Sequence, residues 1–82
     1  MIPTRTTLRT EAIVLRAIDY GESDRIVTFC TADFGKIRGI AKGARRSRKR
    51  FANAIEPFCC TRIFFSRRSP DSLALIEGCD VL

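Results

Sequence analysis

The sequence predicts an all-β fold, a small barrel of five short strands. Three features support this prediction: segments rich in β-branched and aromatic residues, turn signals between them at regular spacing, and one long connection before the fourth segment. At 82 residues, 45% of them hydrophobic, the chain has the length of one domain and enough apolar residues for a packed core. We expect a loose polar arm over residues 1–10 and one domain over residues 11–82, as a fragment of a longer protein.

The first three predicted strands follow one another closely. Residues 11–18 and 24–31 are separated by a segment whose Asp and Gly residues favour a hairpin loop. A second turn ends at Gly35, which can adopt a positive φ, and residues 36–43 form the third strand. Two isoleucines of this strand fall on opposite faces unless a bulge intervenes, and Gly39 is the natural place for one.

The last two strands follow the long connection. Residues 44–57 begin with a nearly continuous cationic run and end at Pro57, so we expect a basic loop or short helix there. Residues 58–65 form the fourth strand, and residues 72–76 open a fifth that runs on towards Leu82. Five strands with the longest connection before the fourth are the arrangement of the oligonucleotide-binding fold, or OB-fold.

Positive charge is concentrated in one part of the chain. The sequence has 15 Lys and Arg against 9 Asp and Glu, and no acidic residue lies between Phe34 and Ile55. Grouped like charges repel one another, whereas an anionic polymer cancels this repulsion and releases counterions. The sequence therefore predicts DNA or RNA binding, against the alternative of a solubilising basic loop with no specific partner. The candidate contacts in this segment are Lys36, Arg38, Lys42, Arg45, Arg46, Arg48, Lys49 and Arg50.

Two aromatic residues are candidates for stacking on nucleic-acid bases. Phe51 adjoins the basic run, and Tyr20 lies in the first predicted loop. The alternative for a Phe in an apolar segment is a place in the core, which is the commoner one. Strong charge with little stacking predicts contacts mainly to phosphates, with little sequence preference.

The residue types argue against catalysis and metal binding. The chain has no His, and its four Cys lack the C-x2-C spacing of a zinc site. We expect these cysteines to be small buried hydrophobes in a reducing cytoplasm. Asp19, Glu22 and Asp24 cluster in the first loop, where capping of backbone groups explains them better than acid–base chemistry. We therefore expect no enzymatic activity and no cofactor, and no membrane association because no apolar run is long enough to span a bilayer.

Five segments, in order along the chain, resemble the N-terminal domain of the RecO family of DNA repair proteins. They are Glu11-Ala12-Ile13-Val14-Leu15-Arg16 followed by Asp19-Tyr20-Gly21-Glu22-Ser23-Asp24-Arg25-Ile26-Val27-Thr28, then Phe34-Gly35-Lys36-Ile37, Ala41-Lys42-Gly43-Ala44-Arg45-Arg46 and Ile55-Glu56-Pro57-Phe58. The resemblance implies an OB-fold with DNA-contacting cations. By position these are Lys36, Arg38, Lys42, Arg45 and Arg46, with Arg25 close by in the hairpin, while Arg48, Lys49 and Arg50 extend the basic patch by charge alone.

The resemblance also implies a function. RecO proteins mediate recombinational repair in bacteria: they bind single- and double-stranded DNA, anneal complementary strands and, with RecR, help to load RecA onto DNA coated by single-strand-binding protein. They continue into a larger helical domain, often with a Cys-rich zinc site, and contact with single-strand-binding protein is expected from that region. We expect this chain to be a DNA-binding module. The alternatives are a module that docks RecR and an RNA-binding OB domain of the translation apparatus.

Overall fold

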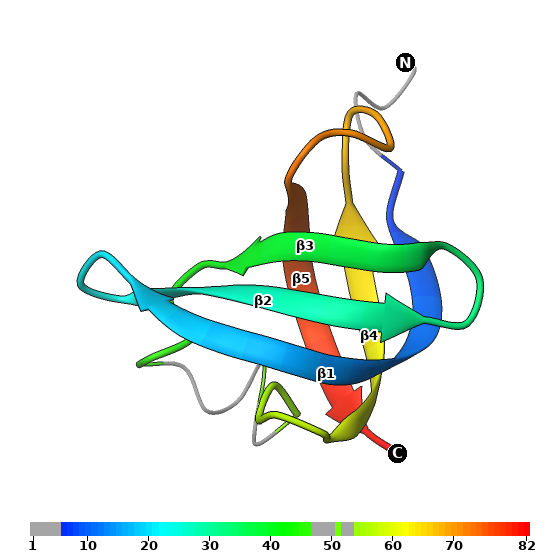
Figure 1. Ribbon diagram of the computed structural model, residues 1–82. Helices are drawn as coiled ribbons and strands as arrows, with labels where there is room; N and C mark the ends of the chain where they lie inside the picture. Colours follow the sequence, from blue (N-terminus) through cyan, green and yellow to red (C-terminus); the bar gives the residue numbers. More distant parts are fainter. Residues whose placement is uncertain (1–5, 47–50, 52–53) are drawn as a thin grey trace.

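The fold is a closed barrel of five strands. A computed structural model describes residues 6–46, 51 and 54–82. Its strands hydrogen-bond in the order β1-β2-β3-β5-β4, and Figure 1 shows β1, β2 and β3 side by side, crossing β4 and β5. This arrangement confirms the predicted five-stranded OB-fold barrel. The strands are β1 Leu8–Tyr20, β2 Asp24–Thr31, β3 Gly35–Ala41, β4 Cys60–Ser66 and β5 Ala74–Val81.

The barrel closes through β1, which belongs to two parts of the sheet. Its first half pairs antiparallel with β4, from Leu8 opposite Phe65, and its second half pairs with β2 as far as Tyr20. A register shift between Val14 and Arg16 marks a β-bulge, which bends a strand and increases its twist. The predicted arm over residues 1–10 was too long, because Leu8–Thr10 are strand residues. Their pairing with β4 is a long-range contact that a local residue pattern does not reveal.

Alternate residues of the strands fill the barrel interior. Val14, Phe29 and Ile37 are partners across β1, β2 and β3, and all three are buried. The inward side chains of β4 and β5 complete the same core. Phe51, from the connection between β3 and β4, also packs there and is 1% exposed. This period-2 alternation leaves the other side chains of each strand on the outer surface of the barrel.

Gly39 of β3 gives room to a core side chain. A Cβ at this position would lie 2.6 Å from Cδ1 of Ile76 in β5, closer than non-bonded carbons approach. The pairing of β2 with β3 runs without interruption from Arg25–Ala41 to Thr31–Gly35, so the bulge expected at Gly39 was wrong. The residue is Gly because Ile76 occupies the space. The turn at Gly35 does have the predicted positive φ, of 69°.

The cysteines differ in exposure, so the expectation that all four are buried was wrong. Cys79 is buried, Cys59 is half-buried, and Cys30 and Cys60 are exposed. The two exposed thiols lie on strands that flank β1, each opposite Ile13. Burial raises the pKa of the Cys79 thiol from 9.0 to about 12, against a hydrogen bond with Thr61 that lowers it.

Raising the pH above 9 should destabilise the domain through Cys79. The unfolded thiol ionises near pH 9.0 whereas the folded one keeps its proton to about pH 12, so its stabilising contribution is complete below pH 9 and is lost between these values. At pH 10 the loss should be roughly 1 kcal/mol. Denaturant unfolding of the wild type and Cys79→Ala between pH 8 and 10 should show a smaller decrease in the variant. Cys30→Ala, which removes an exposed thiol, is the control, and equal decreases in all three proteins would contradict the prediction.

Candidate nucleic-acid interface

The outer face of β1, β2 and β3 carries a cationic row beside an apolar row. Arg16 of β1 is opposite Thr28 of β2, which is opposite Arg38 of β3. The neighbouring row on the same face lies two residues along each strand and consists of Ile18, Ile26 and Ile40. Lys36 lies two residues before Arg38 and therefore shares its face of β3. The register thus brings cations from two strands, far apart in the sequence, to the same surface.

These side chains border a shallow groove of about 480 Å³. Leu15 and Ile18 remain 44% and 40% exposed although both are large and apolar. The bulge in β1 explains why Leu15 and Arg16, which are adjacent in sequence, are both exposed. The groove therefore offers apolar surface between positively charged side chains. We call it the outer groove, and its lining residues are Leu15, Arg16, Ile18, Ile26, Thr28, Lys36 and Arg38.

The cations of the outer groove are free to bind an external anion. Within the described part of the chain, Arg16, Lys36 and Arg38 form no ion pair with a carboxylate. Their charge is therefore not neutralised locally. Arg guanidinium groups bind phosphate oxygens through two parallel hydrogen bonds, so two arginines on either side of Thr28 suit a phosphate backbone.

Two other predicted contacts are held in internal ion pairs. Arg25 lies 3.4 Å from Asp19 and 3.5 Å from Glu56, and its side chain is only 20% exposed. It stabilises the end of the β1–β2 hairpin, so the structure does not support it as a DNA contact. Arg45 donates to the backbone carbonyls of Gly21 and Glu22 at 3.1 Å and lies 3.6 Å from Asp19. It ties the β1–β2 loop to the segment after β3, while 40% of its side chain stays exposed.

The rest of the predicted basic patch is only partly described. Lys42 and Arg46 are exposed just after β3, where they extend the positive charge beyond the outer groove. Arg48, Lys49 and Arg50 lie outside the described residues, and their role as contacts stays a prediction.

The exposed aromatic residues are not the pair that the sequence suggested. Phe51 is a core residue, so its predicted role in base stacking was wrong. Tyr20, the last residue of β1, is 56% exposed and stays a candidate. Sequence reasoning missed Phe58, which is 80% exposed and has a φ of 67°, unusual for a residue other than Gly. Its amide donates to the carbonyl of Val14 at 2.7 Å, beside the bulge in β1.

Sequence reasoning also missed Arg16 and the apolar residues of the outer groove. Arg16 lies outside the acid-free segment that marked the other cations, and a continuous alternation places Leu15 and Arg16 on opposite faces of a strand. Only the bulge between Val14 and Arg16 brings them to one surface. The available signal was the run of apolar residues on both faces of this segment.

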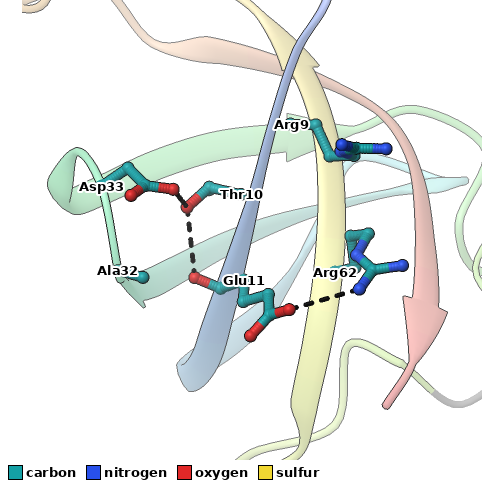
Figure 2. A pocket seen from close by; sticks show the side chains of 6 residues that line it. All are labelled: Arg9, Thr10, Glu11, Ala32, Asp33 and Arg62. Carbon is teal, nitrogen blue, oxygen red and sulfur yellow. Dashed lines mark hydrogen bonds and ion pairs between the residues drawn. The ribbon is translucent and has the colours of Figure 1, made fainter.

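A second hollow, which shares no lining residue with the outer groove, is less suited to a polyanion. It lies where β1, β4 and the β2–β3 turn meet, and Figure 2 shows Glu11, Asp33 and Arg62 bonded to neighbouring residues. Arg62 donates to Glu11 at 3.2 Å, and Thr10 donates to Asp33 at 3.0 Å. Its carboxylates would repel phosphate, whereas no carboxylate lines the outer groove.

The described residues contain neither a metal-binding cluster nor a membrane-spanning helix. No group of three His, Cys, Asp or Glu residues lies close enough to hold a metal ion. None of the described segments forms a helix long and apolar enough to cross a membrane.

Comparison with known proteins gives one consistent family. The family model described as "Recombination protein O N terminal" matches residues 4–82. Three curated relatives share the description "DNA repair protein RecO". The one from Syntrophus aciditrophicus (strain SB) is 54% identical over 79 residues, which are 96% of this chain and 30% of the relative. The one from Syntrophobacter fumaroxidans is 51% identical over 76 residues, covering 93% of this chain and 30% of the relative. The one from Anaeromyxobacter sp. (strain Fw109-5) is 59% identical over 75 residues, covering 92% and 29%. The chain thus spans about 30% of the length of these relatives.

Proposed function

The chain belongs to the family of recombination protein O N-terminal domains, and from that premise we propose that it binds DNA through the outer groove. One observation carries this proposal: Arg16, Lys36 and Arg38 border an apolar surface and have no carboxylate partner in the described residues. Phosphates would contact the cations, while sugars and exposed bases would lie against Leu15 and Ile18. Such contacts read charge and shape, so binding would show little sequence preference.

The proposed biological role is DNA repair by recombination, as the names of the relatives suggest. The basic surface would reduce the repulsion between two DNA strands held close together, which favours annealing. We propose that the longer protein helps to load RecA together with RecR, and that this domain acts in that setting, in the bacterial cytoplasm. Contact with single-strand-binding protein is proposed for a part of the longer proteins that this chain does not match.

Catalysis is not part of the proposal. Two carboxylates of the β1–β2 hairpin have structural partners: Asp19 pairs with Arg25 and Arg45, and Asp24 accepts a hydrogen bond from the Gly43 amide at 2.8 Å. These interactions fit the expectation that Asp19 and Asp24 stabilise the loops.

Titration of the domain with a labelled single-stranded DNA at two salt concentrations tests the proposal. Contact with about four phosphates predicts that the affinity falls roughly 50-fold between 50 and 200 mM salt, because bound cations release counterions from the DNA. A domain that binds no DNA at low salt would overturn the proposal.

The same titration separates the two alternatives. Equal affinity for a matched RNA oligonucleotide would keep the RNA-binding alternative open, and weaker RNA binding would argue against it. Docking of RecR through an apolar surface should change little with salt, so a salt-independent complex with RecR and no DNA binding would favour the interaction module.

A further inference from the structure

We propose that Arg67 forms a phosphate subsite beside the outer groove that only a single strand can reach. The inference rests on the proposed function and adds a strand preference to it. The subsite is a hollow of about 380 Å³ between the edge of β3 and the β4–β5 loop, and Lys36, Arg38 and Arg67 supply its positive charge. We call it the loop hollow.

Two aromatic rings hold Arg67 in place. Its guanidinium carbon lies 5.6 Å from the ring centroids of both Phe34 and Phe65. These rings meet edge to face, with centroids 5.4 Å apart. Phe65 is completely buried, so the pair forms a fixed support on the core. Cation–π attraction to two rings restricts the guanidinium before any ligand binds, which lowers the entropy lost on binding.

The charge of Arg67 is available to a ligand. No described carboxylate forms an ion pair with it. Asp71 also lines the loop hollow and offsets part of its positive charge. Three cations line the same hollow, so they outnumber this one carboxylate. The net local charge therefore favours an anion, and the planar guanidinium favours a phosphate.

The loop hollow continues the outer groove around the edge of β3. Lys36 and Arg38 line both of them. Ile37, whose side chain points into the barrel, also lines the loop hollow, which therefore lies at the edge of β3 and not on its outer face. The β3–β5 pairing covers only Gly39 and Ile40, so no described strand closes this edge next to Lys36. In Figure 1 the β4–β5 loop lies beyond β3, on the side away from β2.

This geometry discriminates between the two forms of DNA. A single strand can bend over the edge of β3, so that one phosphate contacts Arg38 and a later one contacts Arg67. Duplex DNA is stiff, with a persistence length of about 150 base pairs, and cannot follow a bend within a few nucleotides without a large cost. The outer groove should therefore contact both forms, and Arg67 should contribute to single-strand binding alone.

The test compares Arg67→Gln with the wild type on a single strand and on the duplex of the same sequence. We expect the single-strand affinity to fall about tenfold, because one charge-assisted contact is lost, and the duplex affinity to change less than twofold. Arg68→Gln is the matched control, since Arg68 is exposed, adjacent in sequence and outside the residues that line the loop hollow. It should alter neither affinity by more than about twofold.

The outcomes separate this inference from the function on which it rests. If the wild type binds DNA but Arg67→Gln weakens single strand and duplex equally, or weakens neither, the subsite is wrong while the outer groove stands. If the wild type binds neither form, the proposed function itself fails. Arg67→Lys keeps the charge without the planar group, so complete recovery of single-strand affinity would overturn the role of the planar guanidinium in phosphate binding. Equal melting temperatures of the variants establish that the fold is retained.

Discussion

Arg38→Glu should lower the affinity of the domain for single-stranded DNA roughly thirtyfold or more at low salt. The change removes a charge-assisted contact, worth about 2 kcal/mol or more, and places a carboxylate against the phosphates. Arg38 is the best position for this test because it lines both the outer groove and the loop hollow. Its exposed side chain has no described ion-pair partner, so the reversal of charge should leave the fold unchanged.

The matched control for this variant is Arg9→Glu. It changes the net charge by the same amount at another exposed position, on the part of β1 that pairs with β4. Fluorescence anisotropy with the same oligonucleotide at 50 mM salt measures both variants. Arg9→Glu should weaken binding only a few-fold, through the overall field of the protein. Equal losses in the two variants would mean that net charge, and not the outer groove, determines binding.

Gly39→Ala should destabilise the domain by about 2–3 kcal/mol, because the new Cβ would overlap with Ile76. The three nearest atoms are Cδ1 of Ile76 at 2.6 Å, its Cγ1 at 2.8 Å and the carbonyl oxygen of Ala74 at 3.1 Å. The direction of this change in the free energy of unfolding is informative, because Gly→Ala in an unstrained strand stabilises a protein by reducing the entropy of the unfolded chain. Thermal unfolding should show a melting temperature lower by about 10–20 °C.

A double-mutant cycle identifies the cause of that loss. Ile76→Ala removes the two side-chain atoms that meet the new Cβ, at the cost of a cavity in the core. In that background Gly39→Ala should cost less than about 0.5 kcal/mol. The difference between this cost and the cost in the wild type is the coupling energy, and its size is typical of residues in contact. If Gly39→Ala destabilises both backgrounds equally, the contact with Ile76 is not the reason for the glycine.

The strands were predictable from the sequence because local alternation and turn residues specify them. Val27 and Phe29 occur in a period-2 pattern, and Gly35 occurs at a turn that needs a positive φ. The start of β1 was missed because Leu8 becomes a strand residue only by pairing with Phe65. The bulge was assigned to Gly39 because a glycine in a strand suggests one, whereas the glycine here makes room for Ile76.

The candidate site was less predictable, because charge along the sequence does not give position in space. Lys36 and Arg38 were found from the acid-free segment and do line the outer groove. Arg25 was associated with them, yet it pairs with Asp19 across the same hairpin and with Glu56 from a distant part of the chain. Arg67 gave no sequence signal at all, since its importance depends on two rings that only folding brings together.

Mapping of backbone amide shifts during titration with a short single strand tests the DNA interface most directly. A DNA interface at the outer groove predicts that the largest changes occur at Arg16, Thr28, Lys36 and Arg38. The residues that line the hollow around Arg62 should change little. Changes confined to that hollow, with the outer groove unaffected at saturating DNA, would contradict the proposal.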